Sequence, residues 1–314
     1  MNSASVALPS RRSNTSALLP RFAWGLLAYN VLAILWGAVV RATSSGAGCG
    51  DHWPLCNGTV LQSNPQLATL IELAHRMSSG LTLPLVLLLL FWTYRATARG
   101  HLARPAAIWA TLFTFNEALL GALLVLLRLT ADNRSPARAV YLSLHLANTL
   151  LLLGALTLAA HFLSHDHAAD RKEVRLAHMP LAVTGIGAIV AVGVTGTLAA
   201  LSDTLFPATT LAAAFAQDFS ASGGWLLRLR ILHPVSAVIA GTFLCWLVAK
   251  SFARASERPM AMLVLSLLVL QFALGLADVT LLAPVWLQVL HLLGADLLWI
   301  ALVVLTARLC VVSR

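Results

Sequence analysis

Eight long apolar stretches dominate this sequence of 314 residues and limit what it can fold into. A helix of about 20 apolar residues crosses the hydrocarbon core of a bilayer and satisfies its own backbone hydrogen bonds. Only 11% of the residues are charged, against about 25% in a soluble domain. The sequence therefore predicts an all-α integral membrane protein with eight transmembrane helices, at about 22–42, 69–93, 105–128, 139–163, 179–201, 225–250, 259–282 and 285–311.

Positive charges gather in alternate segments between these stretches. They include Arg11, Arg12 and Arg21; Arg95, Arg99 and Arg104; Arg171, Lys172 and Arg175; and Lys250, Arg254 and Arg258. The loop 43–68 contains none. The positive-inside rule then predicts a multi-pass membrane protein with both termini in the cytoplasm, and we expect the membrane to be a bacterial plasma membrane. Against this pattern, Arg128, Arg134 and Arg138 fall on the outer side, where they either serve an anionic ligand or are tolerated.

The formal net charge of +9 is explained by this topology. The arginines lie in short loops, and no segment is long and polar enough to form a nucleic-acid-binding module, so no nucleic-acid partner is expected. Residues 1–21 are basic and Ser-rich, a composition also found in organelle transit peptides. Because the segment is short, we favour a cytoplasmic tail.

The eight stretches divide into two sets of four with related features. The third and seventh contain "EALLG" (117–121) and "QFALG" (271–275), and every even-numbered stretch has a histidine near its outer end. A duplication of a four-helix unit gives two units with the same orientation. We therefore expect two tandem pseudo-symmetric four-helix bundles: a tail at 1–21, an N-terminal half at 22–165, a linker at 166–178 and a C-terminal half at 179–314.

Four of the ten histidines lie at one predicted depth in the membrane. His75, His145, His233 and His291 each follow the start of an even-numbered stretch by six to eight residues, which places them about 10 Å below the outer surface. Two imidazoles that face each other in a bundle fill both axial positions of a haem iron. We therefore expect one haem in each half. Zinc is the lesser alternative, because it usually takes three or four protein ligands.

The two halves differ beside these histidines. Glu72, His75 and Arg76 lie on one helix face, whereas Arg230 and Pro234 accompany His233. A carboxylate inside a membrane is costly and usually functional, so the pattern favours chemistry in the first half and electron transfer in the second. An internal Glu72–Arg76 ion pair is an alternative, and both interpretations can hold together.

The loop "RATSSGAGCGDHWPLCNG" contains a close pair of cysteines, Cys49 and Cys56. On the outer side of a membrane we expect a disulfide that rigidifies a lid over the first-half site, although a reversible redox role stays open. For the remaining polar residues in the spans, hydrogen-bonded helix packing is the default. These residues are Glu117, Gln271, Asp278 and Asp296. For Asp278 and Asp296, a proton route is an alternative.

Several motifs together resemble the haem A synthase family of cytochrome oxidase assembly: "VVRATSSGAGC", "WPLCNG", "ELAHR", "LHLANTL", "LQFALG" and "VLHLLGA". The resemblance implies oxidation of a methyl group of haem O to the formyl group of haem A by successive hydroxylations. It implies that haem O synthase supplies the substrate, and a homo-oligomer is compatible with it. The second half has no outer cysteine pair, which departs from some family members and weakens the idea of a redox relay through both loops.

The resemblance also implies a role for each site residue. His75 and His145 match ligands of the substrate haem, and His233 and His291 match ligands of haem B. Glu72 matches an acidic residue near the substrate, where it accepts a proton or stabilises a developing cation. The supporting residue Arg76 then pairs with a haem propionate or with Glu72, and Cys49 with Cys56 matches the outer-loop pair.

Two other functions fit the four histidines. A bis-histidine di-haem cytochrome b would exchange electrons with quinol and leave its haems unaltered. A transporter would use histidines and acids as a proton relay, although paired histidines at one depth argue against that. Glu72 and the loop with two cysteines favour the enzyme.

Overall fold

The computed structural model describes residues 15–59, 64–165, 172–174, 179–220, 223–252 and 254–313. The expected eight transmembrane helices are confirmed. Residues 1–14 of the expected tail and most of the expected linker 166–178 lie outside the described residues. The spans are α1 (Thr15–Ala42), α2 (Leu67–Ala96), α3 (Ala103–Leu126), α4 (Pro136–His165), α5 (Met179–Leu205), α7 (Trp225–Arg230) continued by α8 (Leu232–Ser251), α9 (Arg258–Thr280) and α10 (Val285–Cys310).

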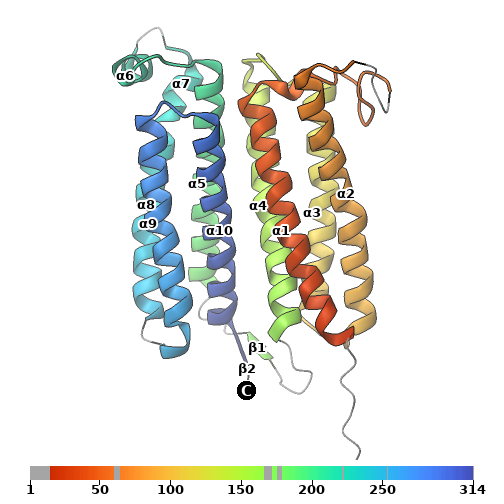
Figure 1. The fold of residues 1–314 in the computed structure, drawn as a ribbon. Helices are drawn as coiled ribbons and strands as arrows, with labels where there is room; N and C mark the ends of the chain where they lie inside the picture. Colours follow the sequence, from red (N-terminus) through yellow and green to blue (C-terminus); the bar gives the residue numbers. More distant parts are fainter. Residues whose placement is uncertain are drawn as a thin grey trace, which may run out of the picture.

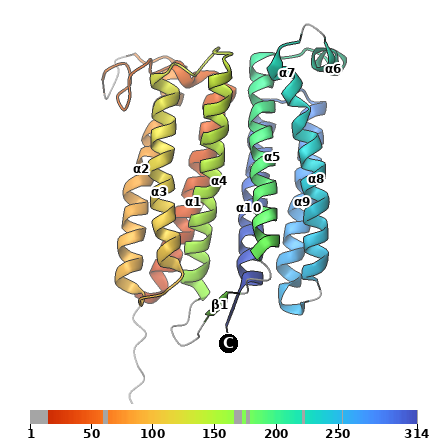
Figure 2. The ribbon, with the colours of Figure 1, turned by 180° about the vertical axis from the view of Figure 1, so that it is seen from behind.

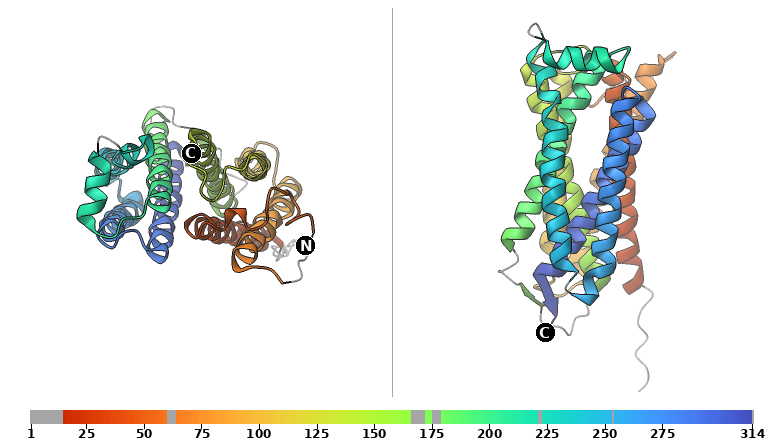
Figure 3. Two further views of the ribbon diagram at one scale, coloured as in Figure 1. Left: turned by 90° about the horizontal axis from the view of Figure 1, so that it is seen from above. Right: turned by 90° about the vertical axis from the view of Figure 1, so that its left-hand side faces the viewer.

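The spans stand side by side in two groups, with α1 to α4 in one and α5, the α7–α8 span, α9 and α10 in the other (Figures 1 and 2). Seen from above, α1 and α4 face α5 and α10 where the groups meet (Figure 3). Trp299 of α10 is 1% exposed and donates a hydrogen bond of 2.8 Å to the carbonyl of Leu150 on α4. This arrangement is compatible with the expected tandem repeat.

Prolines account for two of the chain's breaks. The ring of Pro234 removes a backbone donor and crowds the carbonyl four residues earlier, and the sixth span is divided at Ile231 between α7 and α8. Pro284 precedes α10, and the tight turn before it places Leu282 and Ala283 at positive φ. The first of these breaks lies directly beside His233.

Short elements mark the two ends of the molecule. The end that carries the 43–68 loop also holds the 3-10 helix η1 (Ser45–Ala47) and α6 (Leu211–Phe219), which the sequence did not predict (Figure 1). At the opposite end, β1 (Lys172–Val174) pairs antiparallel with β2 (Val311–Ser313). The start of α1 and the short η3 (Ala255–Glu257) lie at this second end too.

The three arginines that broke the expected charge pattern make contacts within the protein. Arg128 forms an ion pair of 2.5 Å with Asp51, and Arg134 lies over the ring of Phe206 at 4.9 Å. Arg138 is 3% exposed and donates to the carbonyls of Ala131 and Asn133. These contacts hold the outer loops together, which gives all three a structural reason to be there.

Candidate functional site

The four expected histidines occupy α2, α4, α8 and α10. The rings of His233 and His291 lie 6.2 Å apart between centres, at an interplanar angle of 86°. Two imidazoles that bind one metal from opposite sides, with metal–nitrogen bonds of about 2 Å, place their ring centres about 6 Å apart. In the first half, His75 on α2 and His145 on α4 are both lined by glycines of neighbouring helices. The second half therefore brings its two imidazoles to the spacing that a shared metal requires, and the pairing of His75 with His145 stays a prediction.

Each histidine ring lies against a glycine of a neighbouring helix. A Cβ atom built on Gly37, Gly196 or Gly275 would lie 3.0–3.1 Å from Cε1 of His75, His233 or His291 respectively. On Gly121 it would lie 3.8 Å from Cε1 of His145, an ordinary van der Waals contact. Helices α1 and α5 thus support His75 and His233, and helices α3 and α9 support His145 and His291. The same relation occurs in both halves.

Ring nitrogens of these histidines are buried without a hydrogen-bond partner. Within the described ranges, this is true of Nδ1 of His75, His145 and His291. A buried polar atom without a partner costs free energy and calls for a ligand or a function. Among the described residues, no group of three or more His, Cys, Asp or Glu side chains gathers as a metal site. Two imidazoles and a glycine wall fit a haem better than zinc, which takes three or four donors.

A second carboxylate lies in the first half, where the sequence suggested only helix packing. Oε1 of Glu117 on α3 is 3.3 Å from Nδ1 of His145, although not in hydrogen-bond geometry. Asn148 donates to Glu117 Oε2 at 2.5 Å, and the hydroxyl of Thr149 donates to Oε1. Asn148 is itself held by Asn116, which donates to Asn148 Oδ1 at 2.8 Å. A carboxylate beside a ligand imidazole orients the ring and raises its basicity.

The corresponding position of the second half holds an amide. Gln271 is the first residue of the "QFALG" motif, as Glu117 is of "EALLG". Its Nε2 lies 3.3 Å from Nε2 of His291 and donates to the backbone carbonyl of His291 at 3.0 Å. The repeated motif is thus one wall of the second histidine in each half. In the first half this wall carries the carboxylate of Glu117, and in the second half it carries the neutral amide of Gln271.

Glu72 and Arg76 hold the disulfide loop against α2. Arg76 donates to Oε1 of Glu72 at 2.6 Å and to the carbonyls of His52 and Leu55 at 2.6 and 2.8 Å. The backbone N–H of Cys49 donates to Oε2 of Glu72 at 2.8 Å, and Glu72 is 3% exposed. The Glu72–Arg76 ion pair, which the sequence offered as an alternative, is therefore present.

The expected Cys49–Cys56 disulfide is confirmed. A Cβ built on Gly48 would lie 2.6 Å from the backbone nitrogen of Thr69, so the loop packs closely onto the start of α2. Together with the contacts of Glu72 and Arg76, this packing fixes the loop over the outer end of the first half. The idea of a rigid lid is supported by these contacts.

The outer end of the second half has a different arrangement. Arg230, three residues before His233, pairs with Asp203 at 2.8 Å and with Asp218 at 2.6 Å. Both carboxylates are thus engaged by a guanidinium and tie α5 and α6 to α7. Asp278 and Asp296 make no hydrogen bond or ion pair with the histidines in the part of the chain that the structure describes. Their place in a proton route stays a prediction.

Arg41 joins the two halves at the outer end. It donates to the carbonyl of Ala200 at 2.8 Å, to the hydroxyl of Thr204 at 3.0 Å and to Oε1 of Gln288 at 2.8 Å. Arg41 follows Gly37 by one helical turn, and Gln288 precedes His291 by nearly one turn. The contact therefore links the helix that supports His75 to the helix that carries His291. The sequence suggested no role for Arg41.

Comparison with known proteins gives one family and several relatives. A family model described as cytochrome oxidase assembly protein, COX15-CtaA, matches residues 20–303. A Thermus thermophilus protein named "Protoheme IX farnesyltransferase" is 43% identical over 290 residues, which cover 91% of this chain and 48% of that protein. A protein of Halalkalibacterium halodurans named "Heme A synthase" is 42% identical over 92 residues, or 29% of this chain and 31% of that protein.

A Bacillus cereus protein also named "Heme A synthase" is 44% identical over 94 residues, or 29% of this chain and 30% of that protein. The chain therefore spans about half the length of the Thermus relative and matches about a third of the other two. The family match covers the region that contains both histidine pairs and the disulfide loop.

Proposed function

The chain belongs to the cytochrome oxidase assembly family COX15-CtaA, and from this membership we propose that it is a haem A synthase. The reaction converts a methyl group of haem O to a formyl group through successive hydroxylations. It removes four electrons from that carbon, and one C=O bond replaces two C–H bonds. The observation that carries the proposal is the pair of similar histidine sites, of which, among the described residues, only the first has a carboxylate oxygen in contact with a ring nitrogen, Glu117 Oε1 at 3.3 Å from His145 Nδ1.

We propose that the first half, residues 22–165, binds the substrate. His75 and His145 would hold the iron of haem O, with Gly37 and Gly121 leaving room for the two rings. Glu117 would fix the orientation of His145. These roles rest on the buried ring nitrogens and on the close glycine contacts.

A cavity between α1 and α2 suits the hydrophobic tail of such a substrate. Its volume is about 330 Å³, and its lining includes Leu32, Trp36 and the neighbour of His75, Ala74. Leu32 is 65% exposed on the outer surface of the helices, so the cavity opens toward lipid. A farnesyl chain in hydrocarbon would reach the first-half site without crossing water.

Glu72 is the residue that we propose to act on the substrate, by accepting a proton or by stabilising positive charge at the methyl carbon. It lies one turn before His75, and Arg76 and the backbone N–H of Cys49 fix its position. The same contacts anchor the loop, so Glu72 would also keep water from the site. Arg76 would support Glu72 in both roles.

We propose that the second half, residues 179–314, holds haem B between His233 and His291. A haem bound there would supply one-electron transfer to and from the first half. Gln271, whose Nε2 lies 3.3 Å from Nε2 of His291, would hold this ring without adding charge. Arg41 on α1 would hold the two sites in a fixed relative position, because it donates hydrogen bonds to residues of α5 and α10.

The relatives and the charge pattern support further parts of this proposal. A farnesyltransferase that acts on protohaem IX makes a farnesylated haem, the class of substrate proposed here. Haem O synthase is therefore the expected supplier of substrate. The reported relatives come from bacteria, which favours a bacterial plasma membrane, and the distribution of lysine and arginine favours cytoplasmic termini.

Expression of the full chain with haem O synthase, in a host that lacks haem A, tests this function. Acid-acetone extraction and chromatography of the membranes should then yield haem A, and the host with haem O synthase alone should yield none. Haem B alone, with haem O left unconverted, would instead favour a di-haem cytochrome. A protein without haem after porphyrin supplementation would exclude both.

A further inference from the structure

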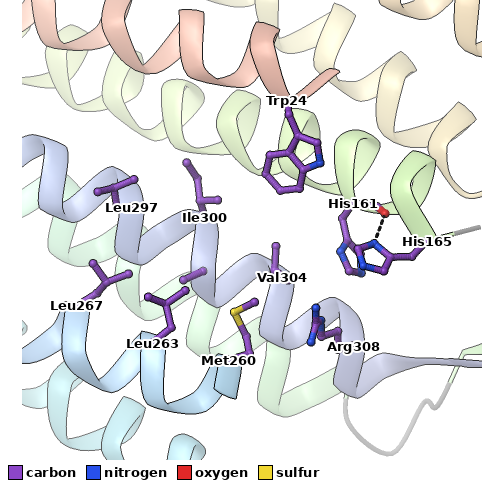
Figure 4. A pocket seen from close by; sticks show the side chains of 11 residues that line it. Trp24, His161, His165, Met260, Leu263, Leu267, Leu297, Ile300, Val304 and Arg308 are labelled. Carbon is purple, nitrogen blue, oxygen red and sulfur yellow. Dashed lines mark hydrogen bonds between the residues drawn. The ribbon is translucent and has the colours of Figure 1, made fainter. Parts of the chain in front are cut away.

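A second cavity lies between the two groups of helices, at the end that carries the termini. Its volume is about 360 Å³, and α1, α4, α9 and α10 line it (Figure 4). This lies within the range of about 300–1,000 Å³ typical of ligand pockets. The cavity is far from the disulfide loop, and neither the histidine pairs nor the proposed reaction uses it.

One wall of the cavity is long and apolar. Leu263 and Leu267 of α9 and Leu297, Ile300 and Val304 of α10 form this wall (Figure 4). From Leu297 to the polar end at Arg308, α10 rises by about 16 Å. One leaflet of a hydrocarbon core about 30 Å thick has a depth of about 15 Å. The wall therefore has the length of an acyl chain in a single leaflet.

The other end of the cavity is polar and holds the guanidinium of Arg308. Arg308 and His165 lie there together, and the rings of His161 and His165 are 4.6 Å apart (Figure 4). The indole of Trp24 completes this end and donates to Ser164 at 2.9 Å. The nearest carboxylate oxygen of Glu257 is 4.0 Å from Arg308, and the Arg308 side chain is 32% exposed. Because the Glu257 oxygen is as far away as 4.0 Å, the Arg308 guanidinium can still donate hydrogen bonds to a phosphate.

We propose that this cavity binds an anionic phospholipid of the leaflet at the end where α1 begins and α10 ends. The acyl chain would follow the apolar wall, and the phosphate would lie at Arg308 and His165. Basic pockets between helices on the cytoplasmic side suit anionic head groups. A quinone with its ring at this end would lie about 25 Å from His291 along α10, too far to exchange electrons with that residue's site directly.

The site would join the two halves from the end opposite to Arg41. Its walls come from α1 and α4 of one group and α9 and α10 of the other, so a bound lipid stabilises their contact. The proposal does not depend on the enzymatic function. It requires only the amphipathic cavity and the membrane that surrounds it.

Thermal unfolding of the purified full chain in detergent tests the site. Phosphatidylglycerol should raise the unfolding temperature at a lower concentration than phosphatidylcholine with the same acyl chains. One charge near a phosphate changes lipid affinity by about fivefold, so Arg308→Gln should raise the half-maximal concentration of phosphatidylglycerol by about that factor. The matched control is Arg95→Gln, which removes an exposed arginine at the same end but outside the cavity.

A second variant keeps the charges and fills the apolar wall. Leu263→Trp should abolish the stabilisation by phosphatidylglycerol while leaving haem content unchanged, which separates this site from the haem sites. Equal stabilisation by the two lipids would overturn the proposal, because any lipid would then fill the groove. An unchanged response of Arg308→Gln, or an equal loss in Arg95→Gln, would overturn it as well.

Discussion

The glycines behind the histidine rings give the sharpest prediction. A Cβ at Gly196 or Gly275 would lie 3.0–3.1 Å from Cε1 of a ring, closer than ordinary contacts of about 3.4–4 Å. Alanine at either position must therefore push His233 or His291 away by several tenths of an ångström. Because both rings belong to packed helices, the shift disturbs the spacing of 6.2 Å between ring centres.

The size of the effect follows from overpacking. Forcing an extra methyl group into a packed site costs about 1–3 kcal/mol, which corresponds to about a 5- to 150-fold loss of haem affinity. Gly196→Ala and Gly275→Ala should lower the affinity for the second haem by such a factor. Gly37→Ala should do the same for the first haem. Gly121→Ala should have a small effect, because its Cβ would lie 3.8 Å from His145.

Transfer of haem from each purified variant to excess apomyoglobin measures this loss. The matched control is Gly187→Ala on α5, whose Cβ would have nothing within 4 Å. It should retain haem as the wild type does, since alanine is also the better helix former. If Gly196→Ala released haem no faster than Gly187→Ala, the rings would not be held in the way described here. Equal losses in Gly121→Ala and Gly275→Ala would refute the ranking by distance.

Three further changes test other parts of the site. Glu117→Gln should raise the reduction potential of the first-half haem and leave the second unchanged, because it removes a negative charge beside His145; spectroscopic redox titration measures both. Glu72→Ala should abolish haem A formation and destabilise the fold by about 3–5 kcal/mol, since it leaves Arg76 partly buried without its carboxylate; haem analysis and denaturant unfolding check this. Arg41→Met should destabilise the fold by about 2 kcal/mol or more through lost charged hydrogen bonds, as read from the midpoint of unfolding.

Each of these changes has a result that would contradict its premise. An equal shift of both haem potentials in Glu117→Gln would show that the carboxylate does not act through His145. Normal haem A formation by Glu72→Ala would exclude a catalytic role and leave only the anchoring of the loop. An unfolding midpoint of Arg41→Met equal to that of the wild type would remove Arg41 as a link between the halves.

The spans and the histidine pairs were predictable because simple periodicities encode them. Length and apolarity fix each span, and a histidine at one depth in every second helix indicates a facing pair. The Glu72–Arg76 ion pair follows from its spacing of four residues on one helix. The sequence also indicated that "EALLG" and "QFALG" are related motifs. The structure adds that their first residues contact His145 and His291.

Other features depend on how separate helices are turned and packed. The contact of Glu117 with His145 requires a particular rotation of α3 against α4, and no pattern within one helix reports that rotation. Arg41 bonds Ala200 and Gln288, which are 159 and 247 residues away. The outer helix α6 has nine residues, too few for apolar periodicity to distinguish it from a loop. A packed structure was needed to find all three.

The stoichiometry of haem in histidine variants tests the central claim most directly. Wild-type protein expressed with haem O synthase should contain one farnesylated haem and one haem B per chain. His145→Ala should lose the farnesylated haem and keep haem B, and His291→Ala should do the reverse. Loss of haem B in His145→Ala with retention in His291→Ala, or an unchanged content in both variants, would contradict the assignment of one haem to each histidine pair.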